Sequence, residues 1–254
     1  MTPKSSPDAD SWGAPRVSIV IPVWRESESL FDFVRAITSW PEVHEVIVAS
    51  ADETPEFRTA VEAAGALCLS AGRPSRGRQM NLGARHASGT WLLFHHADTE
   101  LTHAHVRAIT ALRDAVGGAF HRKFDARHPH CRWIEPFERW RNRHFGALFG
   151  DQSIFVRREH FHALGGFADI PLMEDIEFSK RLRRSGPLAL LDPPIATSTR
   201  RHAIRGPWKT TLLNGALIFL YNMGVSPARL HRWYYGIRQP LETLTQVITQ
   251  PNEN

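Results

Sequence analysis

The amino-acid sequence predicts an α/β fold in which helices flank a mostly parallel central sheet. Short β-branched runs alternate with helical patterns in the first half of the chain, and this order is typical of parallel strands joined by right-handed crossovers. A buried strand at 91–94 runs directly into several polar residues, and open α/β sheets place their ligands at such strand ends. We expect a disordered tail over 1–14, one main domain over 15–204 and a C-terminal helical extension over 205–254.

The composition is ordinary for a globular protein, with 42% hydrophobic and 22% charged residues. No apolar run is long enough for a transmembrane helix, and the polar N-terminus lacks the apolar core of a signal peptide. Because the chain has only two cysteines, we expect a cytoplasmic protein with reduced thiols. The formal net charge of +5 favours anionic partners, while the absence of zinc-finger and basic-zipper spacings argues against nucleic acid.

The first half of the chain supplies three strands and two helices before the central strand. Ser27 is a candidate cap for a helix that reaches Ile37, and a second helix begins at Pro55 and stops at Gly65. The loop after the first strand has neither Gly-x-Gly-x-x-Gly nor Gly-x-x-x-x-Gly-Lys-Ser/Thr, which disfavours a NAD-type dinucleotide fold and a P-loop NTPase. The expected strands, each a short run of mainly apolar residues, cover 16–23, 42–49 and 66–70.

A glycine- and arginine-rich stretch over 70–84 is the first candidate binding feature. Gly72 and Gly77 would let the backbone approach a ligand closely. Three arginines surround these glycines, and a loop of this composition that leads into a helix suits an anion such as a diphosphate. An ordinary solvated basic loop is the alternative. The three arginines are Arg73, Arg76 and Arg78.

The end of the central strand is the second candidate feature. His96 and Asp98 are two residues apart, and in an extended chain both side chains would project to one side, toward one divalent cation or one diphosphate. The alternative is a set of ordinary polar loop residues before a helix that Thr102 caps.

The second half of the chain is less regular. Glu174 and Asp175 open a helix, and acids in a first turn also simply suit the helix dipole. Arg200, Arg201 and His202 follow a late strand, where they either close on a diphosphate or form a solvated cationic turn. The other expected elements are helices over 102–115, 157–164, 208–221 and 227–235, strands from 117 and over 150–156, 188–191 and 195–198, a loop over 121–132 and an amphipathic segment over 133–145.

The last two expected helices combine aromatic and basic residues. This combination is typical of helices that lie on an anionic membrane or meet a lipid acceptor, so we expect a protein that is peripheral to the inner face of a membrane. Packing onto the main domain is the alternative. The residues concerned are Arg205, Trp208, Lys209, Arg229, Arg232, Trp233, Tyr234, Tyr235 and Arg238.

Six motifs follow one another as Val17–Pro22 with Glu26, Ser70–Ala84 with Asn81, Gly89–Asp98, Gly150–Gln152, Gly165–Phe167 and Glu174–Asp175. Their order and spacing resemble family 2 glycosyltransferases of the GT-A fold, whose central sheet is Rossmann-like and mostly parallel. The motifs over 72–81 and 96–99 also resemble a bacterial subgroup that is associated with radical-SAM and selenium-related genes.

The resemblance implies a sugar transferase that uses a nucleotide-diphosphate sugar together with Mn²⁺ or Mg²⁺. Asp98 would hold the metal with His96 and His202, and Asp175 would be the general base of an inverting transfer, with Glu174 beside it. The acceptor is unknown, and a lipid-linked acceptor would suit the C-terminal helices. The residues implied to bind the donor are Pro22, Glu26, Ser50, Asp52, Gly72, Arg73, Arg78, Asn81, Ala97, Asp98, Arg200 and Arg201.

Two positions depart from the family pattern. His96 replaces the first aspartate of the Asp-x-Asp motif, which favours Mn²⁺ because Mg²⁺ prefers oxygen ligands. Ser50 stands where an aspartate usually contacts the base, with Asp52 two residues on, so uracil specificity is not implied. A nucleotidyltransferase and a catalytically weak nucleotide-binding module are the alternative functions.

Overall fold

The computed structural model describes residues 16–25, 28–124, 148–197 and 207–236. The first eight elements are β1 Val17–Val23, α1 Ser29–Thr38, β2 Val43–Ser50, α2 Pro55–Ala63, β3 Leu67–Ser70, α3 Arg76–His86, β4 Trp91–Phe94 and α4 His103–Thr110. The elements that follow are β5 Gly117–Phe124, the 3-10 turn η2 Gly150–Gln152, β6 Phe155–Arg157, α6 Arg158–Ala163, α7 Glu174–Ser185, β7 Leu188–Thr197, α9 Pro207–Asn222 and α10 Pro227–Gly236.

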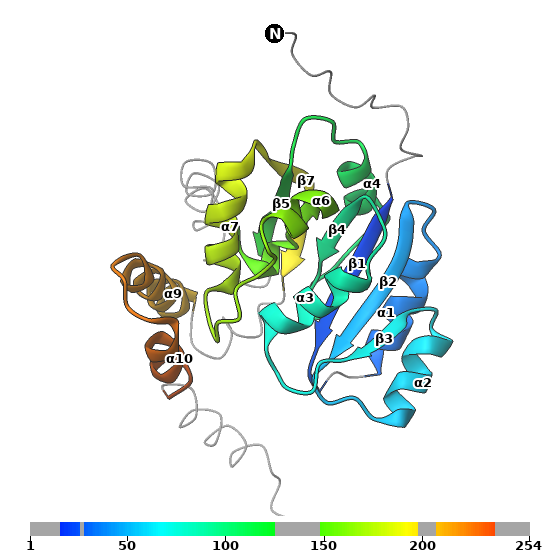
Figure 1. Cartoon of the computed structure of the whole chain (residues 1–254), viewed down its shortest axis with the longest axis horizontal. Helices are drawn as coiled ribbons and strands as arrows, with labels where there is room; N and C mark the ends of the chain where they lie inside the picture. Colours follow the sequence, from blue (N-terminus) through cyan, green and yellow to red (C-terminus); the bar gives the residue numbers. More distant parts are fainter. Residues whose placement is uncertain (1–15, 26–27, 125–147, 198–206, 237–254) are drawn as a thin grey trace, which may run out of the picture.

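A seven-stranded sheet in the order β3-β2-β1-β4-β6-β5-β7 runs through the molecule, with helices on both faces (Figure 1). Strand β1 pairs in parallel with β2 and β4, and β2 pairs in parallel with β3. The expected α/β fold with a mostly parallel sheet is therefore confirmed. Because Val23 lies opposite Ser50 at the ends of β1 and β2, the carboxyl ends of these strands meet at one edge.

Strand β6 breaks the parallel pattern. It runs antiparallel between β4 and β5, and β7 then pairs in parallel with β5. The two short strands expected over 188–191 and 195–198 are wrong, because β7 is one strand that pairs with both ends of β5. The expected loop over 121–132 is also wrong for 121–124, where pairing with β7 satisfies the backbone of a segment rich in histidine and arginine.

Two core clusters cover the two faces of the sheet. Alternate residues of β1 divide between them, with Ile19 and Ile21 in one cluster and Val20 in the other, as the two-residue period of a strand requires. Helices α1, α2 and α4 contribute apolar side chains to the first cluster, whereas α3, α6 and α7 contribute to the second. Helices α3 and α7 therefore lie on the same face of the sheet (Figure 1).

Most of the remaining differences between the expected and the observed elements are at the ends of helices. Helix α1 has Glu28 at its N-cap, and the expected cap at Ser27 lies outside the described residues. Helix α4 ends at Thr110, five residues before the expected Ala115, because the chain turns there toward β5. The expected amphipathic segment over 133–145 also lies outside the described residues.

A third cluster joins the C-terminal helices to α7. Its buried members are Met173 at the N-cap of α7, Ile176 in the first turn of α7, Leu217 of α9 and Leu230 of α10. Figure 1 shows α9 and α10 as a pair at the edge of the molecule, next to α7 and away from the sheet. Packing onto the main domain, the alternative expected for these helices, is thus present. Among the described residues, no helix has both the length and the apolar character to cross a membrane.

Candidate active site

A pocket lies at the carboxyl end of β4, where the first turns of α3 and α7 approach the η2 turn. Its polar lining consists of two acids, one arginine and one histidine. Since α/β sheets bind ligands beyond the carboxyl ends of their strands, this pocket is the candidate functional site. It is lined by Arg76, Met80, Phe94, His96, Gly150, Ile154, Phe167, Glu174 and Asp175.

His95 anchors the segment that follows β4. Its buried ring contacts the Ser153 hydroxyl at 2.8 Å through Nδ1 and the Thr99 carbonyl oxygen at 3.0 Å through Nε2. Burial lowers the pKa of His95 to about 3, so the imidazole is neutral. Because Nε2 must donate to the carbonyl, Nδ1 accepts from the serine hydroxyl.

His96 and Asp98 lie in a turn and not in extended chain. The Thr99 amide donates to the His96 carbonyl at 3.1 Å, so the expectation that the two side chains share one side of an extended strand is wrong. The reason is the hydrogen bond from the His95 ring to Thr99, which closes the segment into a compact loop. His96 is half-buried and lines the pocket, Ala97 packs against the sheet core, and Asp98 is exposed.

Asp175 is held by two backbone amides. Gly150 N–H donates to Oδ2 at 2.8 Å and Ile176 N–H donates to Oδ1 at 2.7 Å. Desolvation, reinforced by the charge of Glu174, raises the pKa of Asp175 to about 7, although the two amides and Arg76 act in the opposite direction. A fixed carboxyl group with a pKa near neutrality is suited to accept a proton from a substrate.

Gly150 brings His96 and Asp175 together. A Cβ atom at this position would lie 2.8 Å from His96 Nε2 and 3.7 Å from Asp175 Oδ2. The glycine therefore leaves room for an imidazole and a carboxylate from distant segments to meet over one stretch of backbone. The sequence did not predict this meeting, because no local pattern relates 96 to 175.

Arg76 lines the pocket, although the family resemblance does not imply it as a donor-binding residue. It is the first residue of α3 and lines the pocket, whereas Arg73 and Arg78 each lie 3.6 Å from Asp169. Desolvation lowers the pKa of Arg76, but the charge of Glu174 and of further acidic groups outweighs this effect and raises it. The start of a helix within the arginine-rich stretch was the available signal for singling out this arginine.

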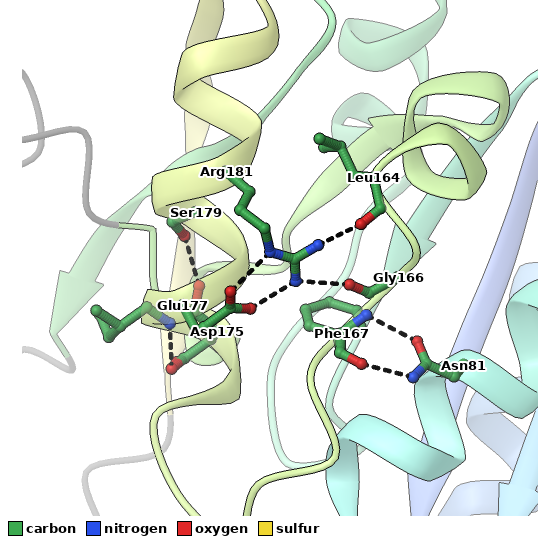
Figure 2. A network of polar contacts seen from close by, with 9 residues as sticks. Asn81, Leu164, Gly166, Phe167, Asp175, Glu177, Ser179 and Arg181 are labelled. Atoms are coloured by element: carbon green, nitrogen blue, oxygen red, sulfur yellow. Dashed lines mark hydrogen bonds and ion pairs between the residues drawn. The ribbon is translucent and has the colours of Figure 1, made fainter. Parts of the chain in front are cut away.

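A polar network supports the segment between α6 and α7 (Figure 2). Arg181 of α7 pairs with Glu177 and donates to the carbonyls of Leu164 and Gly166, the latter at 2.7 Å. From the other side, Asn81 of α3 exchanges two hydrogen bonds of 2.8 Å with the backbone of Phe167. Asn81 thus positions a pocket-lining residue, and its expected contact with the donor stays a prediction.

The ends of β1 and β2 carry a second group of polar contacts. Ser50 is buried, and the carboxylate of Asp52 accepts from the Ser50 hydroxyl at 3.4 Å and from Arg25 N–H at 3.2 Å. Gln79 donates to the carbonyls of Val23 and Ala49 at 2.8 Å each. This residue was not among the expected site residues. Its amide ties α3 to both strand ends, and its only sequence signal was a polar residue on the inner side of that helix.

The remaining predicted residues divide into three groups. Pro22 is buried within β1, and Gly72 lies in an exposed turn before α3. The prediction that a ligand approaches the backbone closely at Gly77 is wrong. Gly77 lies within α3 and faces the chain itself, because an added Cβ would be 2.7 Å from the Ala168 carbonyl oxygen. The residues outside the described part of the chain are Glu26, Arg200, Arg201 and His202.

A family model described as Glycosyl transferase family 2 matches residues 18–163. The chain belongs to this family. It is therefore a family 2-like glycosyltransferase, and the resemblance to family 2 that the sequence suggested is confirmed. No curated protein matches the chain.

Solved structures show the same GT-A fold. A mannosyltransferase from Pyrobaculum calidifontis in complex with GDP-Man and Mn²⁺ matches with a TM-score of 0.60 and 19% identity, over 80% of this chain and 62% of its own. Glucosyl-3-phosphoglycerate synthase from Mycobacterium tuberculosis, in complex with Mn²⁺, UDP and glucosyl-3-phosphoglycerate, matches with a TM-score of 0.54 and 17% identity, over 73% of each chain. The chain thus spans less than two thirds of the mannosyltransferase's length.

The metal ligands expected in this family 2 chain do not form a complete site within the described part of the structure. No group of three histidine, cysteine or acidic side chains comes together among the residues described here. His96 and Asp98, which lie in the same turn, offer an imidazole and an exposed carboxylate at the carboxyl end of β4. A nitrogen ligand suits Mn²⁺ better than Mg²⁺, and a shared role of the two side chains in holding a cation stays a prediction.

Proposed function

We propose that the protein transfers a sugar from a nucleotide-diphosphate donor to an acceptor hydroxyl with inversion at the anomeric carbon, and that Asp175 is the general base. The observation that carries this proposal is the position of Asp175. Its carboxyl group lines the pocket at the carboxyl end of β4, held by the amides of Gly150 and Ile176. Its raised pKa of about 7 supports the same role.

The proposed step is a single displacement. The acceptor oxygen forms a bond to the anomeric carbon while its proton moves to Asp175. The bond from that carbon to the diphosphate oxygen breaks on the opposite face, and the electron pair leaves with the nucleoside diphosphate. One base is sufficient for this chemistry, so Glu174 is assigned to shaping the charge around Asp175 and not to nucleophilic attack.

The departing diphosphate needs positive charge, and two features supply it in this proposal. Arg76 lines the pocket as a cation. His96 and Asp98 would hold Mn²⁺ or Mg²⁺, which stabilises charge on a leaving diphosphate when it is bound. The two matched transferases that carry Mn²⁺ with GDP-Man or with UDP support this class of donor and cofactor.

The proposal also covers the acceptor and the location of the protein. A lipid-linked acceptor, a location peripheral to the cytoplasmic face of a membrane and membership of the radical-SAM-associated subgroup are further proposals from the sequence motifs. The first two depend on the surface of α9 and α10. The proposed mechanism requires only that the acceptor carries a hydroxyl group that can reach Asp175.

A screen of nucleotide sugars tests the proposed function. Thermal unfolding is measured with each candidate donor, with and without Mn²⁺, because a ligand that binds the native state raises the unfolding temperature. A donor that stabilises the protein is then incubated with acceptor mixtures. Release of nucleoside diphosphate supports sugar transfer, release of pyrophosphate indicates a nucleotidyltransferase, and tight binding without turnover indicates a binding module.

A further inference from the structure

Helix α9 is mainly apolar, yet the described part of the chain covers it only in part. No charged residue lies between 210 and 226, and Leu217 packs with Met173 and Ile176 in the third core cluster. On the side opposite Leu217, Leu212 is 70% exposed, Phe219 is 63% exposed and Met223 is 69% exposed. Spacings of seven and four residues place these three side chains in one stripe along the helix.

Such a stripe indicates a partner. Exposed apolar residues that gather in one patch mark interaction sites. The 16 residues of α9 are too few to cross a bilayer core. The geometry is therefore that of a helix lying along an apolar surface, with Leu217 turned toward its own protein.

Helix α10 shows which kind of surface is expected. Its Leu230 is fully buried, while Arg229, Arg232 and Trp233 are exposed and are spaced by three and four residues along the helix. Exposed arginine beside exposed tryptophan is the combination that interfacial helices use, with the indole at the headgroup level and the guanidinium on lipid phosphate. This charge favours an anionic bilayer over an apolar protein face.

We propose that the exposed residues of α9 and α10, namely Leu212, Phe219, Met223, Arg229, Arg232 and Trp233, dock on an anionic lipid bilayer. The helices that would dock are connected to the pocket through α7. Met173 and Ile176, which hold the helix pair, flank Glu174 and Asp175 in sequence and share the first turn of α7. The purpose of docking, delivery of a lipid-borne hydroxyl to Asp175, rests on the proposed function, whereas docking itself does not.

Vesicle flotation with the full chain tests the proposal without any donor or acceptor. We expect binding to vesicles of phosphatidylglycerol and phosphatidylcholine at low salt, and weaker binding at high salt or on pure phosphatidylcholine. Arg229→Gln combined with Arg232→Gln should reduce binding to the anionic vesicles by about tenfold. Leu212→Gln combined with Phe219→Gln and Met223→Gln should reduce it by about tenfold or more.

Leu67→Gln is the matched control, because Leu67 is an exposed leucine at 41% on the distant edge strand β3 and should leave binding unchanged. Far-ultraviolet circular dichroism checks that each variant is folded. Absence of binding to anionic vesicles at low salt would overturn the proposal, as would equal binding by the apolar triple variant. A dimer in solution that this variant dissociates would also overturn it, in favour of a second copy of the chain. Donor turnover, measured separately, decides the proposed function.

Discussion

The polar groups at the ends of β1 and β2, here called the strand-end side, and those of the pocket around Asp175, here called the helix side, are positioned by different means. On the strand-end side, Ser50 is the last residue of β2 and Asp52 lies two residues beyond it, and neighbouring parallel strands bring their carboxyl ends together. On the helix side, Asp175 depends on an amide of Gly150, twenty-five residues away. The comparison shows that regular sheet topology is sufficient to gather one set of groups, whereas the candidate base needs contacts between separate irregular segments.

The largest expected effect comes from removing the base on the helix side. Asp175→Asn keeps the shape of the side chain but removes its basicity, so the transfer rate should fall by about 10²–10⁴-fold. Donor affinity should stay within about twofold, because the strand-end side is unchanged. Steady-state kinetics and calorimetric donor titration measure the two quantities. Glu174→Gln is the matched control and should be milder, and retained turnover in Asp175→Asn would remove Asp175 from the role.

The next effect concerns the exposed carboxylate after β4. Asp98→Ala should abolish the Mn²⁺-dependent part of nucleoside diphosphate binding, with a loss of about tenfold or more, while the fold is retained. Calorimetry with and without Mn²⁺ measures this difference. Asp114→Ala, which removes an exposed aspartate in the turn after α4, serves as the control. Unchanged Mn²⁺-dependent binding in Asp98→Ala would show that the cation is held elsewhere.

A third prediction concerns the support of the helix side. Arg181→Met should lower the free energy of unfolding by about 3 kcal/mol, because the carbonyls of Leu164 and Gly166 and the carboxylate of Glu177 lose their donor. Urea unfolding followed by circular dichroism gives this value. Arg184→Met, at an exposed position on the same helix, should change it by less than about 0.5 kcal/mol. Equal values for the two variants would show that the network does not stabilise the fold.

The smallest effect is a pH dependence that arises in the segment after β4. The folded-state pKa of His95 is lowered to about 3, whereas an unfolded histidine titrates near 6.5. The unfolded chain therefore binds a proton first, and stability falls as the pH drops below about 6.5. This group alone should remove about 2 kcal/mol between about pH 7 and about pH 5. His95→Gln should flatten that part of the profile, and the exposed His44→Gln should not.

The same comparison explains what the sequence could predict. Strands β1, β2 and β4 are short apolar runs bounded by turn residues, so they were expected at nearly their observed positions. Asp175 was expected from the motif at the start of α7. Its contact with Gly150, the meeting of Gly150 with His96 and the clamp formed by Arg181 were not, because each joins residues whose distance in space no local pattern encodes.

Local patterns also failed where tertiary pairing decided the conformation. The segment 121–124 is rich in charge but becomes strand because β7 offers a partner for its backbone. His96 and Asp98 lie in a turn and not in extended chain, because the His95 ring forms a hydrogen bond with the Thr99 carbonyl oxygen. In both cases one long-range or loop-closing contact outweighs the preference of the residues themselves.

The pH dependence of kcat/KM tests the central claim, that Asp175 on the helix side is the base, most directly. Below about pH 7 the wild-type value should fall about tenfold for each pH unit, since protonated Asp175 cannot accept the acceptor proton, and above about pH 7 it should level off. The residual activity of Asp175→Asn should lack this limb of the profile. A wild-type profile that is flat through neutrality, or the same limb in Asp175→Asn, would contradict the account.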